Sequence, residues 1–361
     1  MNQESDGTWL LGWAPIKIDA LGLVTLLGAE EINKKLGQLC VSRITEFLPL
    51  VGSHVVADNS FASPLNGFTV YNITDGICAT DVVGWFARWL LCQKLTYNST
   101  TLIVGTVLSV PGRQGDGAPS RLGPAALLGV VVSAGMVTLA AVIRDWWGLT
   151  NAVALALSAA GRFAILWAMR DAVDRAADRA AHQSTAVVKT FWKLPDGACV
   201  VVYTTRGILT ECLLTTPWPA WPRAYAAGRA VAWTAFLVHI LSLGMAALPS
   251  QLACIAVLAL STLSAVLSLG IRSDLVGSRL QIRRTDHTGW QAGSMAAMFA
   301  RLDLSSDEEQ SMVDWQLMPL RRNRVWWEKY RDLRMKDTPA VFEAWTTKES
   351  WEEFERRFCQ S

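Results

Sequence analysis

The chain has 361 residues, of which 51% are hydrophobic and 18% charged, and its formal net charge is +2. A net charge this small gives no electrostatic footprint for nucleic acid. Seven scattered cysteines, with no C-x-x-C pair and no histidine at ligand spacing, exclude a standard zinc module. The apolar residues are concentrated in a few long blocks without charges, a distribution typical of membrane proteins rather than of soluble domains.

Residues 1–123 are expected to form an N-terminal region that is partly membrane-associated. The N-terminus lacks the basic residues that precede the apolar stretch of a secretory signal. An apolar stretch over residues 77–95 is a candidate for an extra span, although it contains three charged residues. If it crosses the membrane, Asn72 becomes a lumenal glycosylation acceptor. If it does not, neither Asn72 nor the second acceptor motif at Asn98 is used.

Four later segments are long and apolar enough to cross a hydrocarbon core about 30 Å thick, which takes roughly 20 helical residues. In chain order they are residues 124–143, 147–169, 230–248 and 252–271. The second contains one charge, Arg162, in its last third, where a long side chain can reach toward the nearer interface. The region 124–169 therefore holds the first two transmembrane helices, and 230–271 holds a transmembrane hairpin.

The distribution of lysine and arginine predicts the orientation of these spans. Residues 170–229 and the beginning of the tail, residues 272–361, are rich in basic side chains, whereas the two short links carry one and none. Both long segments are therefore expected in the cytosol. Two β-rich runs around Pro195-Asp196-Gly197 predict a cytosolic hairpin. The expected fold is mainly α: a multi-pass transmembrane helical protein with a small cytosolic β-hairpin element and a helical, Trp-rich C-terminal tail.

Three aspartates, Asp171, Asp174 and Asp178, directly follow the second span. Their spacing resembles the first aspartate motif of intramembrane prenyltransferases, in which carboxylates on adjacent helix turns hold Mg²⁺ against a diphosphate. The sequence departs from that motif in having Arg170 in place of the preceding Asn, too few spans and no second aspartate cluster. The alternative is a solvated helical extension of the second span with an i,i+4 pair between Asp171 and Arg175. The second interpretation is favoured.

His239, near the middle of the third span, and Arg162 form a candidate intramembrane polar site, because an ionisable residue within a span is a functional hypothesis by default. Together they could line the path of a metabolite carrier or its accessory subunit. No Asp or Glu lies inside the four spans, which argues against a proton-coupled carrier. The favoured alternative for His239 is a hydrogen bond to a serine hydroxyl of a neighbouring span.

The tail contains a basic stretch, residues 321–336, with Trp326 and Trp327 among seven Lys and Arg residues. A basic helix with tryptophans is attracted to anionic lipid at the cytoplasmic leaflet. A helix that packs on the cytosolic β-element with its charges in solvent fits the same sequence equally well. Both interpretations remain open at this point.

The stretch from Arg144-Asp-Trp-Trp-Gly-Leu-Thr-Asn to Met169, followed by the predicted hairpin with Tyr203-Thr-Thr-Arg-Gly-Ile-Leu-Thr, resembles multi-pass membrane proteins of filamentous fungi over residues 124–280. The resemblance is one of organisation and implies no catalytic or binding residue. Genes for some fungal proteins of this kind lie among secondary-metabolite genes. The resemblance therefore implies a role linked to fungal secondary metabolism.

The leading hypothesis is a non-catalytic, multi-pass interaction or accessory protein that uses no cofactor. It has the lipid bilayer around it and a protein partner at its cytosolic face. The first alternative is a Mg²⁺-dependent membrane prenyltransferase acting through the three aspartates. The second is a metabolite carrier or its accessory subunit. The sequence does not determine which membrane the chain occupies, its oligomeric state or a substrate.

Overall fold

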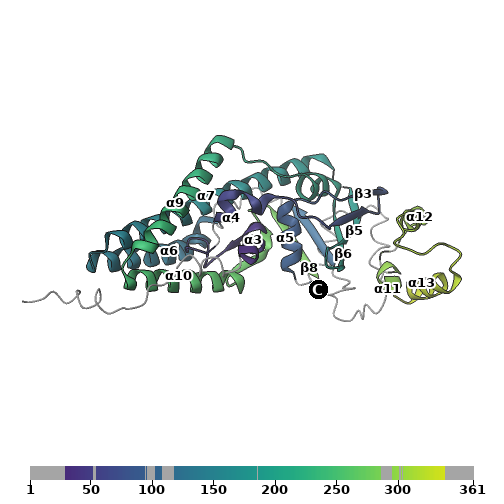
Figure 1. Cartoon of the computed structure of the whole chain (residues 1–361). Coiled ribbons are helices and arrows are strands. Elements are labelled where there is room, and N and C mark those ends of the chain that lie inside the picture. Colours follow the sequence, from purple (N-terminus) through teal and green to yellow (C-terminus); the bar gives the residue numbers. More distant parts are fainter. Residues whose placement is uncertain are drawn as a thin grey trace, which may run out of the picture.

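The computed structural model describes residues 29–51, 54–93, 95, 102–107, 118–184, 186–285, 295–300, 302 and 304–337. These residues form a mainly helical, elongated molecule. A helical bundle lies at one end, a mixed β-sheet lies in the middle, and three short helices lie at the opposite end (Figure 1). The sheet and the helices on its two faces are called the sheet domain below.

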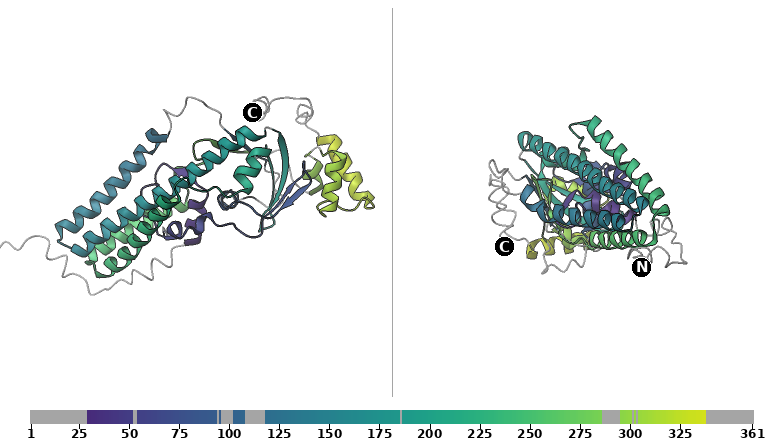
Figure 2. Two further views of the ribbon diagram at one scale, coloured as in Figure 1. Left: turned by 90° about the horizontal axis from the view of Figure 1, so that it is seen from above. Right: turned by 90° about the vertical axis from the view of Figure 1, so that its left-hand side faces the viewer.

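Four helices form the bundle, and they lie side by side in both views of Figure 2. They are α6 (Ala118–Val142), α7 (Trp146–Gln183), α9 (Pro222–Met245) and α10 (Leu248–Val266). All four are long and apolar enough to cross a membrane, which confirms the four predicted segments by length and composition. Many large apolar side chains on them are exposed, including Leu127, Val130, Val131, Val231, Leu237, Leu241, Leu252, Leu260 and Leu263.

Several helix boundaries differ from the prediction: α6 begins at Ala118, α9 begins at Pro222 and α10 ends at Val266. The turn between α9 and α10 lies at residues 246–247, not at 249–251, and Pro249 occupies the first turn of α10. Proline is tolerated there because the first N–H groups of a helix have no partner within the helix. By contrast, α7 continues beyond residue 169 to Gln183, as expected. This confirms the predicted helical extension of the second span.

One sheet of eight strands forms the centre of the molecule, in the order β1-β7-β8-β4-β6-β5-β2-β3. The strands are β1 (Cys40–Ser42), β2 (Thr69–Asn72), β3 (Ile77–Ala79), β4 (Leu102–Val107), β5 (Val187–Lys193), β6 (Cys199–Thr205), β7 (Ile271–Val276) and β8 (Leu280–Thr285). All neighbours are antiparallel except β4 and β6, which are parallel. The predicted hairpin, β5–β6, is present. It is not a separate small element, however, because strands from the N-terminal region and from the tail extend it on both sides.

Both faces of this sheet are covered, and β6 illustrates the consequence. Val200 and Val202 point into a core shared with α5 (Gly84–Cys92) and α7. Cys199, Val201 and Tyr203 point into a second core with the tail helices. The tail helices are α11 (Met295–Ala300), α12 (Ser306–Asp314) and α13 (Arg324–Asp337). Successive side chains of a strand face opposite sides, so a continuous apolar run is required where both sides are buried.

The candidate extra span over residues 77–95 does not form. This stretch contains β3 and the nine-residue helix α5, which is too short to cross a bilayer. Its apolar character has another cause: Phe86 and Trp89 are buried between the sheet and α7, and the ring of Phe86 lies 4.9 Å from that of Trp192. Asn72 is only 7% exposed, and its amide donates to Asp75 at 2.8 Å. Asn98 lies outside the described residues.

Candidate functional site

An irregular stretch of the N-terminal region enters the bundle. We call residues 43–51 the inserted segment; it follows α3 (Ala29–Gly37) and β1. The backbone N–H of Val51 donates to the hydroxyl of Thr262 in α10 at 3.1 Å, and Val51 packs in an apolar cluster with Leu155 and Leu258. Phe47 lies so close to α6 that a Cβ added at Gly129 would be 2.6 Å from its own Cβ. The inserted segment therefore contacts α6, α7 and α10 at once.

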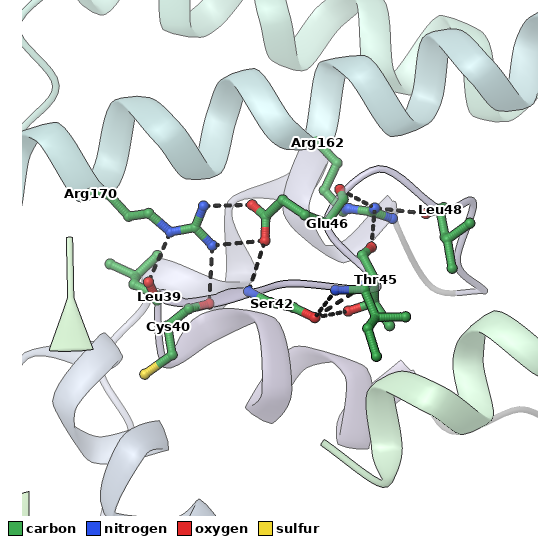
Figure 3. Close-up of polar contacts among 9 residues, drawn as sticks. Leu39, Cys40, Ser42, Thr45, Glu46, Leu48, Arg162 and Arg170 are labelled. Atoms are coloured by element: carbon green, nitrogen blue, oxygen red, sulfur yellow. Dashed lines mark hydrogen bonds and ion pairs between the residues drawn. The ribbon is translucent and has the colours of Figure 1, made fainter. Parts of the chain in front are cut away.

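Arg162 holds the backbone of the inserted segment. Its Nη2 donates to the carbonyl oxygens of Thr45, Glu46 and Leu48 at 3.2, 2.8 and 2.7 Å. The side chain is 1% exposed. Irregular backbone at membrane depth is tolerated only where protein satisfies its polar groups. Arg162 therefore does not reach toward the interface, as the sequence suggested; it points inward, to carbonyls that have no helix or strand to pair with (Figure 3).

Arg170, eight residues further along α7, makes a buried ion pair with Glu46. The distance from Nη1 to Oε1 is 2.5 Å, and both side chains are less than a tenth exposed. Arg170 also donates to the carbonyl oxygens of Leu39 at 2.9 Å and Cys40 at 3.1 Å. Positions eight apart lie on the same side of a helix, and Figure 3 shows both arginines reaching the same stretch of chain.

Two further arginines hold the chain that follows the inserted segment. This chain comprises α4 (His54–Asp58) and the short helix η1 (Ser60–Ala62). Arg88 of α5 is buried and donates to the carbonyl oxygens of Ser60 at 2.6 Å and Ser63 at 2.8 Å. Burial lowers the pKa of Arg88 to about 10, so the side chain stays charged at neutral pH. Arg229 of α9 donates to the carbonyl oxygen of Ala57 at 2.7 Å.

Sequence reasoning identified Arg162 but not its partners. Glu46 is the only charged side chain among residues 44–51, Ile-Thr-Glu-Phe-Leu-Pro-Leu-Val. A single carboxylate in such an apolar run is a signal for a buried ion pair, since Glu is almost never fully buried unless paired. Arg170 lies in a basic segment beside the three aspartates, and neither feature indicates a buried partner. Its partner lies 124 positions away in the chain, a separation that no local pattern encodes.

His239 and Arg162 are not brought together. His239 Nδ1 lies 2.6 Å from the side-chain oxygen of Asn151 in α7, and the imidazole is buried within the bundle. Its partner in the neighbouring helix is thus an amide and not the predicted serine hydroxyl. Asn151 precedes Arg162 by eleven residues, which is about 16 Å along a helix. The two ionisable residues therefore form separate contacts.

The three aspartates after the second span each have a different partner. Asp171 pairs with Arg175 at 3.1 Å, which confirms the predicted i,i+4 contact. Asp174 accepts from the backbone N–H of Ser278 at 2.9 Å, in the turn between β7 and β8. Asp178 pairs with Arg279 at 2.7 Å. In the part of the chain that the structure describes, no three His, Cys, Asp or Glu side chains are grouped so that they could hold a metal ion.

Comparisons with family models, with curated proteins and with solved structures give no match. The resemblance to fungal membrane proteins therefore stays a prediction. What the fold and the site define is a class: a chain with four helices of membrane-spanning character, a mixed sheet domain at one end of them, and an arginine-bound segment where the two parts meet.

Proposed function

We propose that the chain is a multi-pass membrane protein whose bundle crosses the bilayer and holds the sheet domain at the cytosolic surface. The observation that carries this proposal is the apolar surface of the bundle, where leucine and valine side chains of α6, α9 and α10 are exposed. A monomeric soluble protein rarely exposes so many large apolar side chains on one set of neighbouring helices. In a bilayer the same side chains are in contact with lipid.

Tryptophans at the two ends of the bundle support the same proposal. Trp146 and Trp147 begin α7, and Trp218 and Trp221 directly precede α9; all four are exposed. Tryptophan is enriched at both membrane interfaces. The 24 residues of α9 span about 36 Å, which matches a hydrocarbon core of about 30 Å together with part of each interface.

The path of the chain supports one side for the whole sheet domain. The strands come from three stretches: before α6, between α7 and α9, and after α10. An even number of crossings returns each stretch to the same side of the membrane. The stretch between α7 and α9 is rich in Lys and Arg, which places it in the cytosol by the positive-inside rule.

The activity that fits this arrangement best is an interaction or accessory role, in which the bundle anchors a domain that binds a protein partner. The tail helices lie at the end of the molecule farthest from the bundle (Figure 1). There α13 and the turn before it expose five basic side chains, Arg321, Arg322, Arg324, Lys329 and Arg331, beside the acidic Glu328 and Asp332. Arg321 pairs with Glu309, which leaves four basic side chains for a partner. The partner that this surface fits is an acidic protein segment, since basic and acidic surfaces attract across an interface.

The aromatic side chains with which this tail could bind lipid are packed inside the protein. Trp327 is 5% exposed and Tyr330 1% exposed, and both pack in the core between the tail and the sheet. Trp326 is half-buried and stacks on Tyr330 with a ring distance of 5.4 Å. Rings that are used in packing are not available to enter a headgroup layer. The packed interpretation of residues 321–336 therefore has the better support.

A topology map tests the proposal. Epitope tags at residue 2, in the turn at Pro195-Asp196 and at residue 361 are expected to be digested by protease added to the cytosolic side. A cysteine at the exposed position 144, between α6 and α7, is expected to react with an impermeant maleimide only from the opposite side. Protection of the tag at 195–196, or labelling of the cysteine from the cytosol, would refute the arrangement.

A further inference from the structure

Arg162 has more hydrogen-bond donors than the protein uses. A guanidinium carries five N–H donors, and the three carbonyl contacts of Arg162 all come from Nη2. Nε and Nη1 are buried and have no hydrogen-bond partner among the residues that the structure describes. Three of the five donors are thus unpaired. Buried polar groups without a partner are costly, and more so when they carry charge, so this arrangement indicates a missing acceptor.

The charge around Arg162 is also unbalanced. Arg162 and Arg170 face one carboxylate, Glu46, which is already engaged by Arg170. No Asp or Glu is present in α6, α9 or α10, or in α7 as far as Met169. The cluster of Glu46 and the two arginines therefore has a formal charge of +1. Buried charges in proteins are normally paired, so the missing acceptor is expected to be an anion.

The depth of the cluster suits a group from the membrane interface. Trp167 is 59% exposed, and exposed tryptophans favour the membrane interface. It follows Arg162 by five residues, so Arg162 lies about 7–8 Å along α7 from that interface. Phe47, half-buried beside Gly129 of α6, has its ring 4.5 Å from that of Phe163, the neighbour of Arg162. The cluster thus lies next to the seam between α6 and α7. Basic sites between helices on the cytoplasmic side are places where anionic lipid headgroups bind.

We propose that Arg162 binds a phosphate group, supplied either by an anionic phospholipid or by free phosphate. The ligand carries a net negative charge and accepts hydrogen bonds from the unused N–H groups, while Nη2 keeps its carbonyl partners. This inference rests on the proposed membrane location, and it assigns to Arg162 a ligand in addition to its role in holding the inserted segment.

The test uses the full chain purified in a neutral detergent, with the thermal unfolding midpoint as the readout. Phosphatidylglycerol is expected to raise the midpoint by about 2 °C or more, since a ligand that binds only the folded state stabilises it. Phosphatidylcholine, which has the same phosphodiester but no net charge, is expected to have no effect. An equal rise with inorganic phosphate would identify the free anion as the source.

Variants connect the response to Arg162. Arg162→Gln is expected to lose the lipid response. If this variant does not fold, Arg162→Lys takes its place, and it is expected to keep the charge and only part of the response. Arg88→Gln is the matched control, because Arg88 is also a buried arginine that binds carbonyls but lies outside the bundle. It is expected to lower the starting midpoint and to leave the lipid response unchanged.

Two results would overturn the proposal: a wild-type chain that responds to neither phosphatidylglycerol nor phosphate, or an Arg162→Gln chain with the full response. The first would indicate that buried water alone satisfies the unused donors. The topology map is independent of this measurement. If the topology map contradicts the membrane arrangement but the phosphate response depends on Arg162, the membrane arrangement is rejected and the anion site is kept. If the map agrees and no Arg162-dependent response is found, the anion site is rejected and the membrane arrangement is kept.

Discussion

At the scale of single residues, backbone carbonyls are the main partners of the buried arginines. Within the described residues, Arg88 and Arg162 bind carbonyl oxygens without a carboxylate contact, and Arg170 combines two carbonyls with Glu46. A carbonyl partner provides a hydrogen bond but no opposite charge. The inserted segment is therefore held by contacts that fix its backbone and leave one positive charge in the cluster unbalanced.

The ion pair of Glu46 and Arg170 leads to a prediction at this scale. Glu46→Gln leaves two buried guanidiniums without a carboxylate, so we expect a loss of about 3–5 kcal/mol in the free energy of unfolding, as for other broken buried pairs. Denaturant unfolding of the purified chain in detergent measures it. The matched control is Glu30→Gln, since Glu30 belongs to an exposed i,i+4 pair with Lys34 and such pairs contribute little.

A double variant separates the cost of an unpaired charge from the value of the pair itself. Glu46→Leu with Arg170→Met removes both charges and keeps apolar volume. Replacement of a buried pair in this way is often close to neutral, although here it also removes the contacts of Arg170 with two carbonyls. The double variant is expected to be more stable than Glu46→Gln. If it is less stable, the carbonyl contacts outweigh the ion pair.

At the scale of elements, α7 is the helix that joins the bundle to the sheet. Its 38 residues extend over about 57 Å, nearly twice the thickness of a hydrocarbon core. The last turns lie in the core beneath the sheet, where Val173, Ala176 and Ala177 are buried. The small alanine side chains let the helix approach the sheet closely. The bundle and the sheet are therefore connected by one continuous helix.

Asp174 fixes the β7–β8 turn to this helix. Its carboxylate accepts from the backbone N–H groups of Ser278 and Arg279 and from the hydroxyl of Ser278 at 2.8 Å. Asp174→Asn weakens these charge-assisted bonds, and we expect a loss of about 1–2 kcal/mol in the free energy of unfolding. Asp171→Asn removes only an exposed pair and is expected to change stability by less than about 0.5 kcal/mol.

The same two variants bear on the prenyltransferase alternative. If the aspartates bind Mg²⁺, addition of Mg²⁺ to the wild-type chain should raise its unfolding midpoint, and either variant should remove that rise. The observed partners instead lead us to expect no Mg²⁺ effect in all three chains. A clear Mg²⁺-dependent stabilisation that both variants abolish would revive the enzymatic hypothesis.

At the scale of the whole molecule, the basic surface of the tail lies on the opposite side of the sheet from the bundle (Figure 1). Glu309 holds the tail together by contacts with Arg321 and Arg334 at 3.0 Å each, and with the hydroxyl of Tyr330. Since Glu309 engages those two arginines, the basic groups left for a partner are the exposed ones on α13 and the turn before it.

A charge-reversal experiment tests that surface. Arg324→Glu with Lys329→Glu should weaken the salt-sensitive binding of a poly-glutamate probe to the purified chain, with at least about a tenfold rise in Kd if each charge contributes about 0.7 kcal/mol or more. Arg43→Glu, an exposed basic position near the bundle, is the control and is expected to leave binding unchanged. The double variant changes the net charge by twice as much as the control, so a loss in binding free energy half as large in the control would indicate attraction to net charge alone.

The sequence by itself determined the features that depend on short-range patterns. Continuous apolar blocks defined the four long helices, two β-rich runs around Pro195-Asp196-Gly197 defined the β5–β6 hairpin, and the spacing of Asp171 and Arg175 defined an i,i+4 contact. Each of these signals lies within one helix or one turn. A local pattern is sufficient there because the interacting residues are close in the chain.

Only the tertiary structure decided what surrounds those elements. Hydropathy does not distinguish a helix buried under a sheet from one in lipid, so the sequence of α5 is compatible with a membrane span. In the structure, these apolar residues are buried against a sheet whose strands come from three stretches of the chain. Likewise, Arg162 could reach toward an interface or bind the interior, and the carbonyls that it binds lie 114–117 positions earlier in the chain. Burial and pairing over such separations depend on how the whole chain packs, and that packing places a charged side chain inside an apolar bundle.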